Sequence, residues 1–401
     1  MRIVDVNEFY SPTGGGVRSY IDRKLAVMAT LGHELIVIAP GREDRVEYRA
    51  GKGRVIYVKA PAMPFDSNYG LFWDRAPITA LLDRLDPDVV ECCSPWRPAW
   101  IVGNWPGRAL KSFFLHNDNI ATYAQRWFEG IASPARIERA FAWYSRYMAR
   151  FLGRFDTVVS NGPTLVKRFA ARGIPVDAAM PLGIERERFS PALRSEAMRA
   201  AMLAECDLPP GASLLLGIGR HHPEKRWPMV IDAIEHAARR HPIGFILIGH
   251  GVESAAVARR VAGNPHIRLY RAIADRHQLA RLMASCDAFI HGCEAETFGL
   301  VVSEALASGA PLIVPDQGGA AEVARPAFAE TFAARDMRAC AAAIIRLLSR
   351  DRVSLRDAAA KAARDIWSDR DHAVALTEHY ARRIALRDDA RTGGAQARRS
   401  A

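Results

Sequence analysis

The chain has 401 residues, of which 49% are hydrophobic and 25% are charged. This length suits two domains, and this composition is that of globular rather than disordered or fibrous proteins. The sequence has no apolar run near the ~18 residues of a membrane span. Its six cysteines follow neither a disulfide framework nor a metal-binding spacing. We therefore expect a two-domain cytoplasmic protein with reduced thiols.

The net charge of +11 is concentrated in one segment. Residues 101–180 carry 11 Lys and Arg against 5 Asp and Glu, whereas residues 1–100 carry 13 of each class. Such a surplus favours a basic patch that meets phosphate-bearing partners or an anionic membrane surface. A solvated face of a basic protein explains the charge equally well. No RNA- or DNA-binding module accompanies it, so we expect no nucleic-acid partner.

Short β-branched runs alternate with helix-like segments along the chain. These runs lie at 2–6, 34–39, 54–59, 88–91, 112–116, 156–160, 213–220, 244–251, 266–270, 287–292 and 311–316. Continuous apolar strands separated by helices predict parallel sheets that are covered on both faces. The predicted fold class is therefore α/β, with two doubly wound, Rossmann-like parallel-sheet domains that face each other across a cleft.

Pro, Gly and charged residues interrupt this pattern at 180–194, which predicts a domain boundary there. We expect an N-terminal domain over 1–180 and a C-terminal domain over 181–365. Residues 366–390 are helix-like and are expected to return to the N-terminal domain. Residues 391–401 are small, polar and basic, which is typical of a flexible tail.

Three glycines, Gly14 to Gly16, follow the first predicted strand and open a helix. Glycines let the backbone approach a ligand closely, and a helix N-terminus favours an anion. The spacing matches neither GxGxxG nor a P-loop. On its own, this segment is better explained as a tight turn than as a phosphate site.

The loop GIGRHHPEKRW at 217–227 follows a later strand and contains Arg220 and Lys225. One fork-shaped and one point-like cation on a rigid loop suit a diphosphate, although an exposed basic turn is the alternative. His221 and His222 lack a clear third ligand, so we expect no metal ion there.

The segment CEAETFGLVVSEALASG at 293–309 contains Glu296 and Glu304 within an apolar run. Buried carboxylates require partners. We expect Glu296 at the start of a helix whose first amides could bind an anion or hydroxyls, with Glu304 about two turns further on. Either both glutamates hold a ligand, or Glu296 caps its own helix and Glu304 pairs with an arginine. The residues alone favour neither alternative.

These motifs together resemble those of retaining nucleotide-sugar glycosyltransferases of family 4, which have the GT-B fold. The E-x7-E element of Glu296 and Glu304 is accompanied, in the family order, by PLGIERERFSP at 181–191 and by the Arg…Lys diphosphate loop. The resemblance covers most of residues 1–380. It implies an enzyme, a glycosyltransferase that moves a sugar from a nucleoside-diphosphate donor to a hydroxyl acceptor.

The resemblance implies four catalytic residues. Arg220 and Lys225 would neutralise the donor diphosphate and stabilise the departing nucleoside diphosphate. Glu296 would engage sugar hydroxyls, and His116 would lie beside the donor sugar. Cationic side chains and helix dipoles can replace a metal ion, so no metal and no cofactor are expected. The DxD sequence at 86–88 fits a turn rather than a metal site.

The same resemblance implies the remaining donor contacts. Glu304 would accept hydrogen bonds from the ribose hydroxyls. Backbone groups that would bind the phosphates or the sugar belong to Gly15, Gly16, Phe298, Gly299 and Leu300. Uridine diphosphate is the favoured carrier and guanosine diphosphate the rival, because no residue in the sequence identifies the base.

The acceptor is expected at the N-terminal domain, where three tryptophans, Trp73, Trp96 and Trp100, lie in aromatic-rich segments. Residues 134–155 predict an amphipathic helix with an arginine-rich face. Such a helix packs on its own sheet, which is the favoured alternative, or lies on a membrane.

We expect a membrane lipid as the acceptor, reached by peripheral attachment to the inner face of the membrane. A sugar of an envelope polysaccharide or lipopolysaccharide is the alternative acceptor. A nucleotide-sugar epimerase and a non-catalytic nucleotide-sugar or lipid-binding protein are the rival classes. The sequence predicts no oligomeric state.

Overall fold

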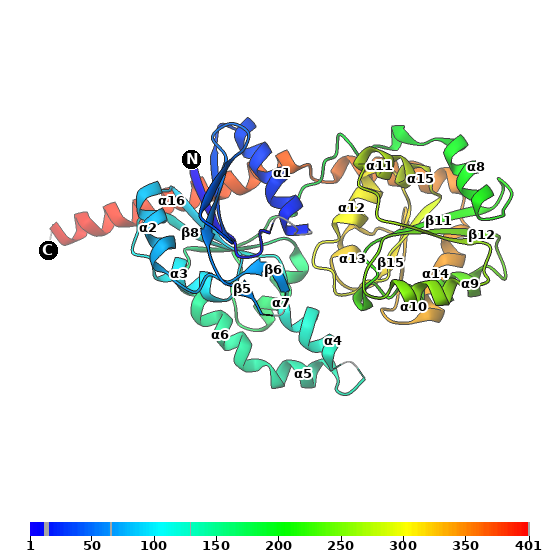
Figure 1. The fold of residues 1–401 in the computed structure, drawn as a ribbon, viewed down its shortest axis with the longest axis horizontal. Helices are drawn as coiled ribbons and strands as arrows, with labels where there is room; N and C mark the ends of the chain where they lie inside the picture. The colour runs from blue at the N-terminus through cyan, green and yellow to red at the C-terminus, as the bar shows by residue number, and fades with distance from the viewer. Residues whose placement is uncertain (12–15, 65, 129, 400–401) are drawn as a thin grey trace. The chain divides into compact units, whose positions relative to one another are not determined.

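The computed structural model describes residues 1–11, 16–64, 66–128 and 130–399. The chain forms two compact units (Figure 1). Unit 1 comprises Met1–Pro181 and Asp369–Ala401, and unit 2 comprises Leu182–Ser368. Among the described residues, no helix combines the length and the apolar character needed to cross a bilayer.

Unit 1 contains an eight-stranded sheet in the order β10-β9-β8-β7-β1-β2-β4-β3, in which only β3 is antiparallel to its neighbour. Successive strands run outward in one direction from β1 and then in the other from β7, so the switch point lies between β1 and β7. The strands are β1 (Arg2–Val6), β2 (Glu34–Gly41), β3 (Arg45–Tyr48), β4 (Arg54–Lys59), β7 (Val89–Cys92), β8 (Leu110–Leu115), β9 (Thr157–Ser160) and β10 (Ala178–Ala179). A separate hairpin consists of β5 (Ala62–Met63) and β6 (Asp66–Gly70).

The helices of unit 1 pack around this sheet, with α1 against α16 and α3 against α2 and α6. They are α1 (Gly16–Thr30), α2 (Ala76–Leu85), α3 (Arg97–Asn104), the π-helical η1 (Ile120–Ala124), α4 (Gln125–Trp127), α5 (Pro134–Ala140), α6 (Ala142–Leu152), α7 (Pro163–Ala171) and α16 (Asp369–Arg399).

Unit 2 contains a six-stranded parallel sheet in the order β13-β12-β11-β14-β15-β16. Its switch point lies between β11 and β14. The strands are β11 (Ser213–Ile218), β12 (Ile243–Ile248), β13 (Ile267–Tyr270), β14 (Ala288–Ile290), β15 (Leu312–Pro315) and β16 (Ala329–Phe332).

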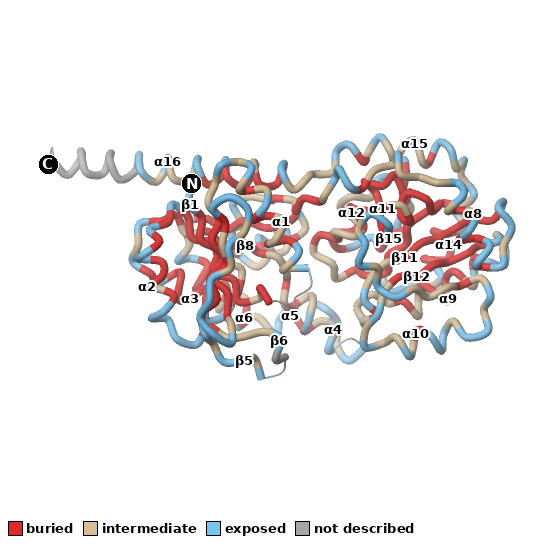
Figure 2. Tube along the Cα trace, turned by 45° about the horizontal axis from the view of Figure 1, so that its top comes forward, coloured by how far each residue is buried: buried red, intermediate tan, exposed pale blue. Residues whose placement is uncertain are grey.

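Helices cover the sheet of unit 2, whose central strands are buried (Figure 2). The apolar side chains form two separate clusters, as expected for a sheet that is covered on both faces. The helices are α8 (Glu196–Glu205), α9 (Trp227–Ala237), α10 (Ser254–Val261), α11 (Arg276–Ser285), α12 (Leu300–Ala307), α13 (Gly319–Val323), α14 (Met337–Leu348) and α15 (Arg352–Ala362), with single turns η2 (Pro191–Leu193), η3 (Pro223–Lys225) and η4 (Ala363–Asp365).

The α/β fold class is confirmed, because both units have doubly wound sheets and every predicted strand is present. The sequence analysis missed β3, β5, β6, β10 and β16, which are short or polar. It also predicted one helix over 134–155, whereas the backbone leaves the helical conformation at Phe141 and separates α5 from α6.

The long helix α16 belongs to unit 1, where it contacts α1 and β8. Tyr380 on its buried face donates a hydrogen bond to Glu91 Oε1 at 2.6 Å. His372 Nε2 lies 2.9 Å from Tyr20 Oη, and its Nδ1 lies 2.9 Å from the carbonyl oxygen of Pro181. The helix extends to Arg399, into the segment for which we expected a flexible tail; that flexibility stays a prediction.

A buried charged cluster lies beneath α16. The Lys24 ammonium pairs with Glu91, and both side chains are 3% exposed. Asp5 is buried nearby on β1. Burial raises the pKa of the Asp5 carboxyl to about 7; the Lys24 charge opposes this rise and the Glu91 charge adds to it. The cluster therefore holds one ammonium, which pairs with Glu91, against two carboxyl groups.

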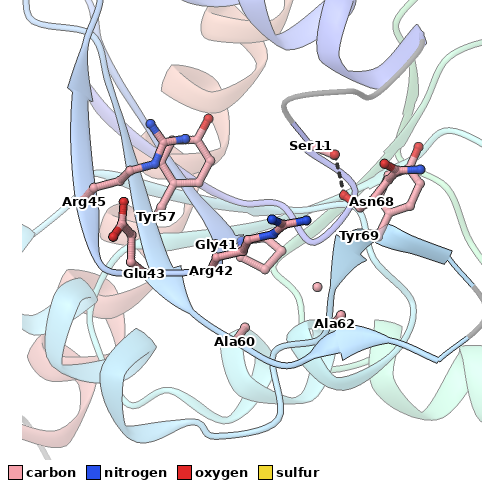
Figure 3. Close-up of a pocket in the computed structure, with 12 residues that line it drawn as sticks. Ser11, Gly41, Arg42, Glu43, Arg45, Tyr57, Ala60, Ala62, Asn68 and Tyr69 are labelled. Atoms are coloured by element: carbon pink, nitrogen blue, oxygen red, sulfur yellow. Dashed lines mark hydrogen bonds between the residues drawn. The ribbon is translucent and has the colours of Figure 1, made fainter.

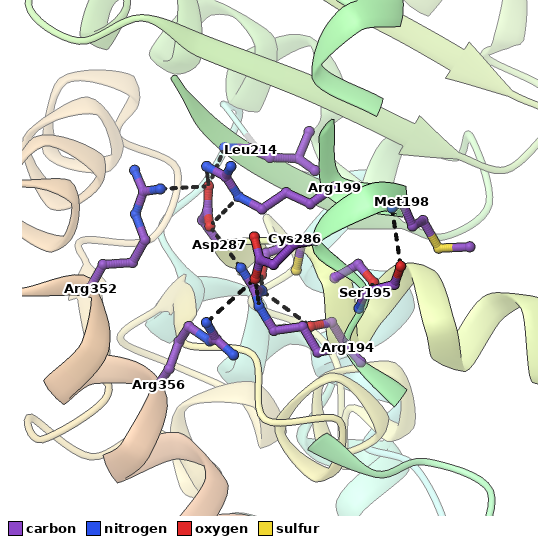
Figure 4. Close-up of polar contacts among 12 residues, drawn as sticks. Arg194, Ser195, Met198, Arg199, Leu214, Cys286, Asp287, Arg352 and Arg356 are labelled. Atoms are coloured by element: carbon purple, nitrogen blue, oxygen red, sulfur yellow. Dashed lines mark hydrogen bonds and ion pairs between the residues drawn. The ribbon is translucent and has the colours of Figure 1, made fainter. Parts of the chain in front are cut away.

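A second buried cluster lies in unit 2, at the start of β14 (Figure 4). The Asp287 carboxylate is 2% exposed and accepts two hydrogen bonds from Arg199, at 2.9 and 2.7 Å. Arg194 lies 3.5 Å from it and Arg352 3.8 Å. Because a buried carboxylate is costly without partners, this cluster joins α8 and α15 to the sheet.

The raised pKa of Asp5 predicts a pH-dependent stability. The folded state holds a proton that the unfolded state releases, so stability is lost as pH rises from about 4 to about 7. We expect Asp5→Asn to remove this loss and to stabilise unit 1 at pH 8 by up to about 4 kcal/mol, at about 1.4 kcal/mol per pKa unit.

Calorimetric unfolding of wild type and Asp5→Asn at pH 5 and pH 8 checks this expectation. Asp86→Asn, which removes an exposed carboxyl, is the control, and its effect on stability at pH 8 should be smaller than that of Asp5→Asn. A variant less stable than wild type at pH 8 would contradict the raised pKa of Asp5.

Candidate functional site

The candidate site of unit 2 lies at the switch point of its sheet. Strands β11 and β14 are neighbours, and their carboxyl ends lead into the loops 219–226 and 291–299. Ligands of doubly wound sheets bind at such a point. The two loops are joined there by a salt bridge, in which Lys225 Nζ donates to Glu296 Oε2 at 2.9 Å.

A third side chain completes this cluster. His291, which is fully buried, places Nε2 2.6 Å from the same Glu296 oxygen. Burial alone would raise the pKa of the Glu296 carboxyl, but the neighbouring Lys225 and His291 outweigh it and hold that pKa well below its usual range. Burial alone would lower the pKa of Lys225, but Glu296 raises it. Lys225 and Glu296 are therefore both charged at neutral pH.

Arg220, which was predicted beside Lys225, does not join this cluster. Its side chain is 74% exposed and donates to Glu224 at 3.2 Å, within its own loop. The structure thus brings Lys225 together with Glu296, and leaves Arg220 at the surface of the same loop.

A second cluster of charged side chains, which was not predicted from the sequence, holds the loop 291–299 through Glu294. Glu294 accepts hydrogen bonds from Arg226, at 2.8 and 2.6 Å, and from Arg335 at 2.7 Å. Arg226 has a left-handed backbone, with φ of +52°. The signal was present in the sequence as the arginine that follows Lys225, but its partner Glu294 lies 68 positions away, and Arg335 lies a further 41 positions along the chain.

Backbone packing holds the loop 291–299 in place. Gly318 has a φ of +82°, and a Cβ atom there would lie 2.4 Å from the carbonyl oxygen of Glu294. The amide of Gly319 donates to the carbonyl of Glu296 at 2.6 Å. The pair of glycines after β15 is therefore required by this close approach, which places Glu296.

The helix that follows begins where the sequence analysis expected an anion site. Gly299, with φ of +77°, is the N-cap of α12. The backbone amides of Phe298, Gly299 and Leu300 lie too early in α12 to donate to a carbonyl of the same helix. The helix dipole adds partial positive charge there.

Glu304 lies further along α12 and its side chain is 8% exposed. Its carboxylate accepts a hydrogen bond from Arg276 at 2.6 Å, and Arg276 also lies 3.3 Å from Glu185. The arginine partner that was one of the two alternatives is therefore present. It leaves the role of Glu304 toward a ligand as a prediction.

Three donor atoms, from His291, Cys293 and Glu296, lie within 4.8 Å of one another, which is a spacing that could hold a metal ion. The Lys225 ammonium already bonds the Glu296 carboxylate, and its positive charge would repel a metal ion bound to that carboxylate. Burial raises the pKa of the Cys293 thiol to about 12, so the thiolate that a metal requires is disfavoured. These residues fit a charge cluster better than a metal site.

In unit 1, His116 follows β8. Its ring stacks on Phe114 with centroids 4.4 Å apart and meets the edge of Tyr20 at 5.3 Å. Burial lowers the pKa of His116 to about 3, helped by the charges of Lys24 and His372. The imidazole is therefore neutral at physiological pH. Gly16 is the first residue of α1, and Gly15 lies outside the described residues.

The three predicted acceptor-side tryptophans have different environments. Trp73 is 72% exposed and Trp96 45% exposed. Trp100 packs on Tyr147 and Phe151, and its Nε1 donates to Tyr147 Oη at 3.1 Å. Trp100 is thus engaged within the unit, whereas Trp73 and Trp96 present surface to solvent.

A cavity of about 500 Å³ lies in unit 1 after β2 and β4 (Figure 3). Its polar lining includes Arg42, Arg45, Asn68 and Tyr69, and Arg45 lies over the Tyr57 ring at 4.0 Å. It was not predicted from the sequence, because its walls come from four separate segments, at Ser11, 40–45, 57–62 and 68–70. Aromatic rings, an amide and guanidinium groups together suit a polyhydroxylated or anionic ligand.

Comparison with known proteins places both units in families. The family described as Glycosyltransferase Family 4 matches residues 14–188, and the family described as Glycosyl transferases group 1 matches residues 202–366. Together these matches cover most of both units.

Two curated relatives are similar over most of the chain. A GDP-mannose-dependent alpha-(1-6)-phosphatidylinositol dimannoside mannosyltransferase of Mycobacterium tuberculosis (strain ATCC 25177 / H37Ra) is 30% identical, covering 80% of this chain and 81% of the relative. A GDP-mannose-dependent alpha-mannosyltransferase of Mycolicibacterium smegmatis is 29% identical, covering 81% and 82%.

Among solved structures, sucrose-phosphate synthase from Thermosynechococcus elongatus has a TM-score of 0.75 at 16% identity, covering 96% of this chain and 100% of that chain. Anabaena Alr3699/HepE, in complex with UDP and glucose, has a TM-score of 0.68 at 17% identity, covering 95% and 99%. At these identities the likeness shows the fold alone.

The close packing at Gly318 yields a prediction with a matched control. We expect Gly318→Ala to destabilise unit 2 by more than about 2 kcal/mol, because the added Cβ atom requires the loop that carries Glu296 to move. Gly263 also has a positive φ, of +84°, but has open space around it. Gly263→Ala should cost only about 1 kcal/mol. Equal thermal destabilisation by both substitutions would contradict this account of the loop.

Proposed function

Since the chain belongs to glycosyltransferase family 4, with the GT-B fold, we propose that it transfers a mannosyl group from GDP-mannose to a hydroxyl of a membrane lipid, with retention of the α configuration. The observation that carries the site assignment is the Lys225–Glu296–His291 cluster at the switch point of unit 2. The observation that supports the choice of donor and acceptor is the similarity to mannosyltransferases.

The donor proposal corrects the preference for uridine diphosphate in the sequence analysis. The relatives at 30% and 29% identity are named for GDP-mannose. The structures named with UDP are only 17% identical, which carries no argument about the base. Guanosine diphosphate is therefore the proposed carrier.

Charge neutralisation is the proposed contribution of unit 2 to the chemistry. The departing diphosphate gains negative charge as the bond to the sugar breaks. Lys225 keeps two N–H donors beyond the one bonded to Glu296, and the first amides of α12 add further donors. Arg220, exposed on the same loop, could turn toward the second phosphate. Preorganised cations of this kind would stabilise the leaving group without a metal ion.

Orientation of the sugar is the proposed role of the carboxylate and imidazole groups. Glu296, held ionised by Lys225 and His291, would accept hydrogen bonds from sugar hydroxyls. His116, with its pKa lowered to about 3, would act as a neutral hydrogen-bonding group rather than as an acid. The carboxylate of Glu304, oriented by Arg276, would accept hydrogen bonds from the ribose hydroxyls.

Retention would follow from attack by the acceptor hydroxyl on the face that the diphosphate leaves. The acceptor oxygen forms the new bond to the anomeric carbon as the bond to the diphosphate breaks. The acceptor proton passes to a phosphate oxygen of the leaving GDP. No protein nucleophile is assigned.

The acceptor proposal rests on the relatives. One is named for phosphatidylinositol dimannoside and others for phosphatidyl-myo-inositol. A membrane-lipid acceptor implies peripheral attachment, with the donor supplied from the cytoplasmic side. A sugar of an envelope polysaccharide is the alternative acceptor, and it would be glycosylated without vesicles present.

The proposed donor site leads to a prediction about the affinities of GDP and UDP. In calorimetry with EDTA, we expect GDP to bind more tightly than UDP. Glu304→Ala and Lys225→Ala should each weaken GDP binding by about 10- to 100-fold, since each removes a charge-assisted contact of about 1.5–3 kcal/mol. Lys225→Ala should also lower kcat.

Glu330→Ala is the matched control, because Glu330 pairs with Arg346 in the same unit and lies outside the proposed site. Its GDP affinity should equal that of wild type. Tighter binding of UDP would overturn the donor proposal, and GDP binding that requires added Mg²⁺ would overturn the metal-independent mechanism.

A further inference from the structure

A short segment of unit 1 carries a large share of the exposed apolar side chains. Five of the twelve large hydrophobic side chains that are exposed among the described residues lie between positions 123 and 143. We call these five the aromatic surface: Tyr123 (47% exposed), Trp127 (65%), Phe128 (40%), Ile131 (77%) and Trp143 (55%). Contiguous exposed apolar side chains are uncommon in monomers and mark interaction sites.

Ring contacts connect the members of the aromatic surface. Tyr123 and Trp127 have centroids 5.9 Å apart. Phe128 lies 6.1 Å from Phe141, which in turn lies 6.3 Å from Trp143. The four exposed rings therefore form two groups, one on η1 and α4 and one that joins the turn after α4 to α6 through Phe141.

The segment is attached firmly to the body of unit 1. Arg172 donates two hydrogen bonds to Asp118, both at 2.9 Å, and one to Glu138 at 2.9 Å. Ile137 and Met148 are buried in the core. In Figure 1, α5 lies at the lower edge of this unit, farther from its sheet than α6. Some side chains of the segment, such as Ile137 and Met148, are thus packed inside unit 1, whereas those of the aromatic surface are exposed.

The same segment carries exposed positive charge. Its arginine rim consists of five exposed arginines, Arg136, Arg139, Arg146, Arg150 and Arg154. Residues 120–154 contain six arginines against two glutamates, Glu129 and Glu138, and Arg172 already bonds Glu138. Apolar rings next to surplus cations match a bilayer interface, where rings enter the headgroup region and cations meet anionic lipids.

We propose that residues 120–128 and 130–154 form a membrane-docking surface that binds anionic lipid bilayers. This inference rests on the proposed function only in its choice of a lipid acceptor, and it names where the protein meets that lipid's membrane. A symmetric contact between two copies of this surface would bring two arginine rims together, so a second copy of the chain is not the favoured occupant.

Flotation of the full chain with vesicles tests the docking surface. We expect binding to vesicles of phosphatidylcholine with 30% phosphatidylglycerol, and little binding to phosphatidylcholine alone. Trp127→Ala combined with Ile131→Ser should reduce binding at least 10-fold, and Arg136→Glu with Arg139→Glu should do the same and abolish the salt dependence. All four side chains are exposed, so melting temperatures should stay within a few degrees of wild type.

Tyr48→Ala is the matched control, because Tyr48 is 79% exposed on β3 and lies outside this surface; it should bind vesicles as wild type does. Equal flotation of wild type and the 127/131 variant would overturn the proposal. So would a wild-type dimer that the 127/131 variant converts to a monomer, since that outcome assigns the surface to a protein contact.

GDP calorimetry on the same proteins separates this inference from the proposed function. Variants of the docking surface should keep wild-type GDP affinity. Wild-type protein that binds GDP but not anionic vesicles would overturn the docking surface alone. Wild-type protein that binds anionic vesicles through this surface but not GDP would support the docking surface and overturn the proposed donor.

Discussion

The salt bridge between Lys225 and Glu296 is the interaction on which the candidate site depends. It joins the loops that follow β11 and β14, the two strands at the switch point of unit 2. The two side chains are only 12% and 22% exposed, so removing either partner would leave the charge of the other poorly solvated and unpaired. The surrounding structure therefore serves to keep this pair in place: His291 bonds the same carboxylate, and Gly318 and Gly319 let the backbone of 294–298 pack closely. The diphosphate of the proposed donor would meet there a cation that is already positioned.

Unit 1 uses buried polar groups in a comparable way. Helix α16 covers β8 and contributes Tyr380 to Glu91, while His372 links Tyr20 to the carbonyl of Pro181, where the first stretch of the unit ends. Tyr20 also contacts the ring of His116. The imidazole assigned to the sugar is thus placed by the same helix that closes the core of this unit. Its neutral state follows from that burial.

Sequence patterns predicted the parallel strands because their continuous β-branched runs, such as ELIVIA at 34–39, have no other stable location than a buried sheet. The hairpin β5–β6 was not predicted, because β5 has only two residues and β6 is polar. Lys225 and Glu296 were each identified from local motifs, but their mutual contact spans 71 positions and no periodicity encodes it. The same limit hid the partners of Glu294, Glu304 and Asp287. The nucleotide base could not be derived, since no residue within the recognised motifs identifies it.

The most direct test of the account is a transfer reaction in which the product is identified. The protein would be incubated in EDTA with GDP-mannose and vesicles that contain phosphatidylinositol, followed by mass spectrometry of the lipids and NMR of the anomeric proton. The account predicts an α-mannosyl lipid and GDP in equal amounts, with no transfer from UDP-sugars. A β-linked product, or transfer from a UDP-sugar in place of GDP-mannose, would contradict it.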